Sequence, residues 1–221
     1  MNDAEITNFY SEGSDSPQNI VIFLHGLGSN GQDLIALAGV MGHIMPDTVF
    51  VSPDAPFDCD MAPPGYPNSY QWFSLQDREP AVMEKGVENA APILEAFIKE
   101  QLEKYGLDYG DLALCGFSQG TMMSLYKGTR LPKPIAGILG YSGAQLGEPG
   151  PNKTPVCLIH GEADDVVPVE AFFHARQELD KAGFTVTGHT TPGLTHSIDE
   201  RGLREGSLFL KSVLYAETPS E

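Results

Sequence analysis

The feature that most constrains the fold is an alternation of short, unbroken apolar runs with longer helical patterns. The apolar runs lack the alternation of a half-exposed strand, and they occupy residues 19–24, 48–52, 112–115, 135–139 and 156–159. Helical patterns lie between or after them, at residues 81–105, 119–129, 169–182 and 199–214. Short apolar runs of this kind are typical of strands buried on both faces. The alternation therefore predicts an α/β fold with a mainly parallel central sheet flanked by helices.

Length and composition favour one domain. The 221 residues, 41% of them hydrophobic, suffice for one sizeable core. We expect a single domain over residues 1–221, with its core at about 18–214. The rhythm breaks at residues 54–80, where prolines and aromatic residues are interspersed. A connection this long is typical of a binding loop or lid, and a surface flap packed on its own aromatic residues is the alternative.

Charge and cysteine content narrow the partners and the location. Thirty acidic against thirteen basic residues give a net charge of −17, which disfavours nucleic acid and anionic membrane surfaces as partners. Three cysteines are an odd number in a chain too large to need disulfides, and this favours the cytoplasm. The first five residues lack the pattern of a signal peptide, and no apolar run reaches membrane-spanning length. We therefore expect a cytoplasmic protein without stable membrane insertion.

A serine nucleophile is indicated by Gly116-Phe117-Ser118-Gln119-Gly120. This G-x-S-x-G pattern follows a strand-like run and opens a helical pattern, which is the context that the motif requires. Its two glycines permit a tight turn that presents Ser118 at the carboxyl end of the strand. The pattern alone is common, so its meaning depends on partners elsewhere in the chain.

A serine hydroxyl needs a base within hydrogen-bond reach and a third group to orient that base. Three histidines follow the acidic candidates in the chain. His174 lies in a helical pattern and His189 in a strand-like run, so both are predicted to be surface or packing residues. His196 lies in the turn-rich segment 192–197 just after that run, and we expect it to be the base for Ser118.

The acid is expected in the loop that follows the strand-like run 156–159. Asp164 and Asp165 compete there, and they cannot both point at one imidazole. Asp164 occupies the G-x-x-D position after Gly161, which favours it, and Asp165 is then a solvated or helix-capping neighbour. A loop at this strand end faces the same side of the sheet as the serine.

Backbone N–H groups are the expected stabilisers of charge on the carbonyl oxygen. One is the N–H of Gln119, and the other comes from the glycine-bearing loop 25–28, with Leu27 as the expected donor. A plain strand-to-helix turn is the alternative for that loop. His25 and His160 are expected to shape the floor of the site through hydrogen bonds. We expect no metal and no cofactor, because metal-ligand spacing and phosphate-binding glycine motifs are absent from the sequence.

Four motifs together resemble the phospholipase/carboxylesterase family, which includes the acyl-protein thioesterases. They occupy residues 24–28, 116–120, 160–168 and 195–196, and the resemblance extends over about 18–214. It implies an α/β-hydrolase fold and cofactor-free hydrolysis of carboxylic esters, in some members of lysophospholipids or acyl-cysteine thioesters. It also implies a triad of Ser118, Asp164 and His196, with an oxyanion hole at Leu27 and Gln119. The segment 71–73 looks like the substrate-side loop of the family.

Two departures from the family pattern bear on substrate choice. Thr121 stands where many members have a further glycine, and the segment 140–143 is less apolar than usual. Both are expected to reshape the pocket without touching the triad.

The predicted function is hydrolysis of carboxylic esters through an acyl-serine, acting on a small-molecule or lipid-like ester or on an acylated protein. The alternatives are a peptidase or amidase on the same fold and a non-catalytic ligand-binding protein. The protein is expected to be a monomer or a weak homodimer. Substrate contacts are predicted from the long loop and from the acid and histidine loops, at Trp72, Phe73, Leu75, Val166 and Leu194.

Overall fold

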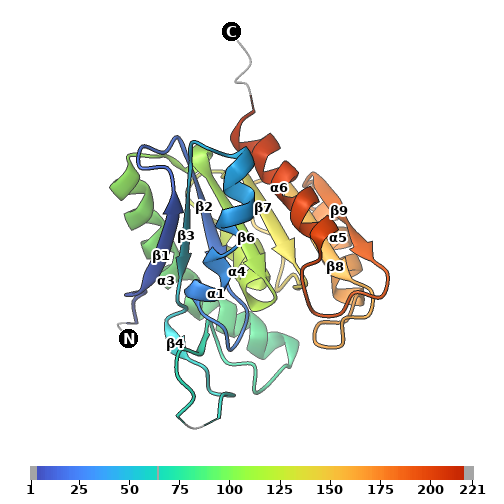
Figure 1. Ribbon diagram of the computed structural model, residues 1–221. Helices are drawn as coiled ribbons and strands as arrows, with labels where there is room; N and C mark the ends of the chain where they lie inside the picture. Colours follow the sequence, from blue (N-terminus) through green and yellow to red (C-terminus); the bar gives the residue numbers. More distant parts are fainter. Residues whose placement is uncertain (1–3, 64, 217–221) are drawn as a thin grey trace.

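The computed structural model describes residues 4–63 and 65–216, so residues 1–3, 64 and 217–221 of the expected domain lie outside the described residues. Seven strands form one twisted sheet in the order β1-β3-β2-β6-β7-β8-β9 (Figure 1). The strands are β1 Phe9–Gly13, β2 Asn19–Leu24, β3 Thr48–Pro53, β6 Leu112–Phe117, β7 Gly137–Tyr141, β8 Val156–Gly161 and β9 Val186–Thr191. Every neighbouring pair is parallel except β1 with β3 at one edge. This is the predicted mainly parallel sheet.

Helices cover both faces of the sheet, as Figure 1 shows. They are α1 Gly31–Ile35, α2 Ala38–Met41, α3 Pro80–Tyr105, α4 Gln119–Gly128, α5 Glu170–Lys181 and α6 Glu200–Leu214, with 3-10 turns at Gly42–Ile44 and Tyr109–Asp111. Strand β2 divides its side chains between the two layers. Ile20, Ile22 and Leu24 pack in a core cluster with α3, α4 and α5, whereas Val21 and Phe23 pack in a second cluster with α1, α2 and α6. Burial on both faces explains why the strand reads as one unbroken apolar run.

Strands β2, β3, β6 and β8 begin at the predicted residues and end within two residues of the prediction, but the prediction for β7 is displaced as a whole. The expected strand at 135–139 lies at Gly137–Tyr141, where Gly140 pairs with Gly116 and Tyr141 with Phe117. Its two glycines are needed there because helices pack closely against them. A Cβ at Gly137 would lie 2.8 Å from Val213, and one at Gly140 would lie 2.6 Å from Thr121.

Several short elements have no counterpart in the predicted pattern. Strand β1 has the sequence FYSEG and is half-buried or exposed throughout, so it lacks the apolar run of the buried strands, and it pairs with β3 at the edge of the sheet. Helices α1 and α2 are five and four residues long, too short to produce a helical period.

The long loop at residues 54–80 consists of a folded part and an outer part. Strands β4 Phe57–Asp58 and β5 Tyr70–Gln71 form a small antiparallel pair at its base. Beyond β5 the chain enters the core, and Trp72, Phe73 and Leu75 are buried. Tyr66, between the two strands, is 64% exposed. No helix among the described residues is long and apolar enough to cross a membrane.

Candidate active site

Ser118 lies at the sharp turn between β6 and α4. Its φ of +53° and ψ of −116° are unusual for a residue with a side chain, and its N–H donates to the Tyr141 carbonyl at 2.9 Å. The flanking glycines are required by space. A Cβ at Gly120 would lie 1.7 Å from the Leu24 carbonyl oxygen, and one at Gly116 would lie 2.4 Å from the Gly120 backbone. This is the strand, turn and helix context that the motif predicts.

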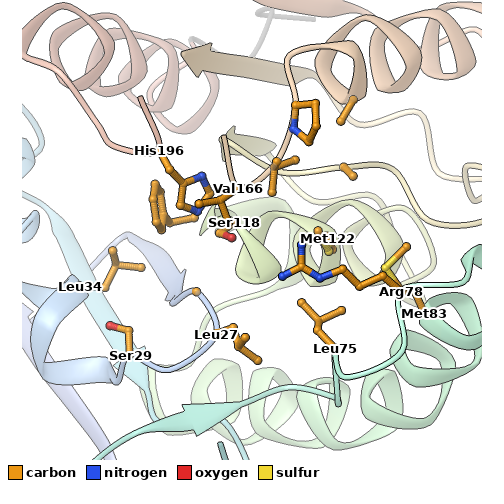
Figure 2. Close-up of a pocket in the computed structure, with 16 residues that line it drawn as sticks. Leu27, Ser29, Leu34, Leu75, Arg78, Met83, Ser118, Met122, Val166 and His196 are labelled. Carbon is orange, nitrogen blue, oxygen red and sulfur yellow. The ribbon is translucent and has the colours of Figure 1, made fainter. Parts of the chain in front are cut away.

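Asp164 and His196 meet from two different loops. His196 follows β9, and its Nδ1 lies 2.7 Å from Oδ2 of Asp164, which follows β8. A carboxylate only accepts, so Nδ1 carries the proton and Nε2 is the basic nitrogen. The imidazole ring also lies 4.8 Å, between centroids, from the Phe117 ring. His196 and Ser118 line the same cavity, and in Figure 2 the imidazole points toward the serine hydroxyl.

Further hydrogen bonds hold the Asp164 carboxylate. Its Oδ1 accepts from the N–H groups of Val166 and Val167 at 2.9 and 2.8 Å. Burial raises the pKa of this carboxyl, but the hydrogen bond from His196, the two N–H donors and the charge of His196 together outweigh burial and leave the pKa below its ordinary value. The group is therefore ionised at neutral pH. Asp165 is exposed.

The buried side chain of His160 packs beside the same carboxylate. Its Nε2 lies 2.8 Å from the Val167 carbonyl oxygen, which can only accept, so Nε2 carries the proton. The same nitrogen lies 3.4 Å from Oδ2 of Asp164. His160 is 2% exposed and lies beneath the site, where the sequence predicted it.

The loop after β2 and the first turn of α4 hold the two N–H groups predicted for the oxyanion hole. Leu27 lines the cavity together with Gly26, and Gln119 is the first residue of α4 after Ser118. Within residues 4–63 and 65–216, neither the Leu27 N–H nor the Gln119 N–H has a hydrogen-bond acceptor.

Buried hydrogen bonds join this loop, the elbow and the long loop. His25 donates from Nδ1 to the Gly26 carbonyl at 2.7 Å and accepts from the Ala55 N–H at Nε2, so it is neutral, and burial lowers its pKa. Trp72 donates from Nε1 to the His25 carbonyl at 3.0 Å. The Gln119 side chain accepts from the Trp72 N–H at 2.9 Å and donates to the Phe73 carbonyl at 2.8 Å. His25, Trp72 and Gln119 are all 0% exposed.

A cavity of about 420 Å³ opens in front of Ser118 (Figure 2). This volume lies within the range of small-molecule sites. Its wall is mostly apolar, and it includes Leu27, Leu34, Leu75, Met83, Phe117, Met122, Ala144, Val166, Val167, Pro168 and Ala171. Ser29, Arg78, Ser118 and His196 supply its polar groups. Among the described residues, no cluster of three or more His, Cys, Asp or Glu side chains could hold a metal ion.

The cavity includes two of the five predicted substrate contacts. Leu75 and Val166 line it. Trp72 and Phe73 are not among the residues that line it: both are buried in the core cluster, and the Trp72 N–H and the Phe73 carbonyl bond the Gln119 side chain. Leu194 does not line it either, and its carbonyl accepts from the Ala163 N–H within the acid loop. Alternating aromatic and proline residues indicated an apolar segment, but not which face of it meets the core.

The two departures from the family pattern compensate one another. The Thr121 hydroxyl lies 2.8 Å from the carbonyl oxygens of both Gly116 and Tyr141. A Cβ at Gly140 would lie 2.6 Å from the Thr121 side chain, and one at Gly143 would lie 2.3 Å from it. The segment 140–143 therefore makes the space that Thr121 occupies. None of these residues lines the cavity, so neither departure contributes a side chain to its wall.

Other cavity residues have no counterpart in the prediction, among them Leu34, Met83, Met122 and Arg78. Met122 is part of the helical pattern after the elbow, and a helix that starts at the nucleophile must direct some side chain of its first turn toward the site. Leu34 and Arg78 come from short or irregular segments, which carry no periodic signal.

Known proteins resemble this chain in both sequence and fold. The model of the family described as phospholipase/carboxylesterase matches residues 7–214. The chain is 30% identical to acyl-protein thioesterase 1 of Emericella nidulans, over 89% of this chain and 91% of that protein. It is 28% identical to the esterase YpfH of Escherichia coli, over 89% of this chain and 84% of that protein. The crystal structure of esterase PE8 superposes with a TM-score of 0.86 at 38% identity, covering 93% of this chain and 98% of that one. The chain therefore belongs to the phospholipase/carboxylesterase family and is a carboxylic ester hydrolase with the α/β-hydrolase fold.

Proposed function

We propose that this enzyme cleaves esters through an acyl-serine on Ser118, with His196 as general base and acid and Asp164 as its orienting partner. The observation that carries the proposal is the 2.7 Å bond between His196 Nδ1 and Asp164 Oδ2 at the cavity that holds Ser118. It leaves Nε2 of the imidazole free to take the serine proton.

The proposed reaction uses only groups of this chain, the ester and water. Ser118 Oγ attacks the ester carbonyl while His196 Nε2 removes its proton. The N–H groups of Leu27 and Gln119 stabilise the resulting oxyanion, and loss of one such donor costs about 3 kcal/mol of transition-state stabilisation. His196 then protonates the leaving alcohol, and the acyl group remains on Ser118. Water, deprotonated by His196, attacks the acyl-serine, and His196 returns this proton to Ser118 Oγ as the acid is released.

The apolar wall of the cavity supports a hydrophobic acyl group. Each methylene taken from water contributes about 0.8 kcal/mol, which corresponds to about fourfold in kcat/KM while the cavity still has room. Activity should therefore rise along a series of straight-chain esters until the chain outgrows the cavity. Thioesters enter the same chemistry, because a thiol can leave from the corresponding tetrahedral intermediate and the same acyl-serine remains.

The proposal is tested with p-nitrophenyl esters from acetate to laurate, on the wild type and on Ser118→Ala, beside labelling with a fluorophosphonate. We expect labelling and turnover in the wild type and neither in the variant, with a loss of at least about 10³-fold. Thermal unfolding of both proteins serves as the control for folding. Unchanged turnover in Ser118→Ala, or a folded wild type that resists labelling, would refute the proposal. A parallel series of acyl thioesters of matched length measures the preference between oxygen and sulfur leaving groups.

We place this enzyme in the cytoplasm, as one catalytic domain that works as a monomer or a weak homodimer. The three cysteines are free, and Cys115 and Cys157 are buried, which supports a reducing compartment.

A further inference from the structure

We propose that Arg78 selects esters that carry an anionic oxygen group, a carboxylate or a phosphate, on the part of the substrate that fills the cavity. This inference rests on the proposed function and adds a substrate class to it.

Arg78 belongs to the segment just before α3, and its side chain lines the cavity. Figure 2 shows its guanidinium extending between Leu75 and Met122 toward Ser118. Among the described residues that line the cavity, none is acidic, and His196 is the only other side chain able to carry a positive charge. The site therefore combines an apolar wall with one permanent cation.

Arg78 differs from the other four arginines of the chain. Each of those has a partner: Arg176 lies near Asp180, Arg201 and Arg204 near Glu205, and Arg130 over the Tyr126 ring. For Arg78, no carboxylate within residues 4–63 and 65–216 lies at ion-pair distance, although Asp77 and Glu79 are its neighbours in the sequence.

The unpartnered guanidinium is notable because this chain has thirty acidic and only thirteen basic residues. In so acidic a protein a surface cation has many possible partners, yet this one points into a cavity that lacks acids. A guanidinium presents paired N–H donors that match the two oxygens of a carboxylate or phosphate. The chemistry of the site is thus complementary to an ester with an apolar segment and an anionic end.

A competing explanation is that the aliphatic stem of Arg78 merely covers the apolar wall while its charge remains in water. The two explanations differ in one measurable respect. A covering stem acts equally on charged and uncharged esters, whereas a binding guanidinium acts on the charged ester alone.

The experiment compares matched esters with the anion free or masked. The acyl series uses mono-p-nitrophenyl adipate and suberate, each against its methyl-capped diester. The leaving-group series uses the butanoyl ester of p-hydroxybenzoate against that of its methyl ester. The measured quantity is the ratio of kcat/KM for the free anion to that for its capped twin, at low and at physiological salt.

We expect Arg78→Met, which keeps an apolar stem, to lower this ratio at least about fivefold in one of the two series. The expected change is modest because Arg78 is exposed, and ion pairs at exposed side chains are screened by water and salt. Added salt should lower the ratio in the wild type but not in the variant. Arg78→Lys, which keeps the charge and loses the fork, should give an intermediate ratio. Arg204→Met is the matched control, because it removes an exposed arginine that does not line the cavity.

The position of the anion is decided by the series that responds: adipate and suberate place it on the acyl side, and hydroxybenzoate places it on the alcohol side. A change below twofold in both series, or an equal change in Arg204→Met, would overturn the inference. The capped esters test the proposed function separately. If they are turned over by wild type and not by Ser118→Ala while the ratio is insensitive to Arg78, only the role of Arg78 fails.

Discussion

Two sets of residues around Ser118, an acid–base side and an elbow side, are held in place by different kinds of contact. On the acid–base side, Asp164 and His196 come from separate loops and are joined by one side-chain hydrogen bond, with the His196 side chain 16% exposed. On the elbow side, His25, Trp72 and Gln119 are fully buried and joined by several hydrogen bonds to backbone groups. The first arrangement suits the proton transfer that we propose, and the second suits rigidity. Substitutions on the acid–base side should therefore affect turnover, and substitutions on the elbow side should affect stability.

The largest expected effect is on the acid–base side, at Asp164→Asn. The new amide can still accept from the N–H groups of Val166 and Val167, but it cannot hold the His196 tautomer in which Nε2 is basic. We expect kcat for a p-nitrophenyl ester to fall by about 10³ to 10⁴, with a much smaller change in melting temperature.

Asp165→Asn is the matched control for that experiment. Asp165 is exposed and one residue away, so its amide variant should retain activity within about threefold. If Asp165→Asn were the inactive variant and Asp164→Asn the active one, the acid would have to be reassigned.

The next largest effect is expected on the elbow side, at Trp72→Ala. Trp72 is 0% exposed, and its truncation leaves a cavity in the core and removes the indole donor of the His25 carbonyl, whereas the backbone N–H at position 72 still donates to the Gln119 side chain. Chemical denaturation should show a loss of about 3–5 kcal/mol in the free energy of unfolding.

Tyr66→Ala is the control for Trp72→Ala, because it truncates an aromatic residue of the same loop that is 64% exposed, and it should change stability by less than about 0.5 kcal/mol. The pair also tests the sequence-based view of Trp72 as a substrate contact. If Trp72→Ala raised KM with little loss of stability, that view would be right and the division between the two sides would be wrong.

Much of the fold and the candidate triad could be predicted from the sequence. Buried parallel strands and long helices leave apolar periods, so β2, β6, β8, α3 and α4 were predictable within a few residues. Ser118, Asp164 and His196 were predictable as candidates because each polar residue of a triad must follow a strand at one end of the sheet.

The positions that escaped prediction depend on contacts between distant segments. The burial of Trp72 is decided by hydrogen bonds to Gln119 and His25, each 47 residues away in the chain. Arg78 and Leu34 reach the cavity from segments without any period. A local pattern contains no information on which distant surface an irregular segment will meet.

The smallest of these effects is expected at Gln119, which tests the comparison most closely because its backbone is assigned to turnover and its side chain to stability. Its backbone N–H is a proposed oxyanion donor, whereas its side chain bridges the Trp72 N–H and the Phe73 carbonyl. Gln119→Ala keeps the first and removes the second, so we expect unfolding to become easier by about 2 kcal/mol while kcat falls far less than in Asp164→Asn. Gln76→Ala, at an exposed glutamine of the long loop 54–80, should be nearly neutral.

Gln119→Glu distinguishes the loss of a hydrogen bond from the loss of side-chain volume. The new carboxyl matches glutamine in size and can still accept from the Trp72 N–H, but when ionised it sets an oxygen against the Phe73 carbonyl and buries a charge. Burial raises the pKa of such a group, so the proton that restores the donor binds as pH falls. The stability deficit relative to wild type should accordingly be largest at neutral pH and shrink toward pH 5, as measured by urea unfolding at each pH. A deficit independent of pH would mean that the side chain only fills space and that the elbow side is held by packing alone.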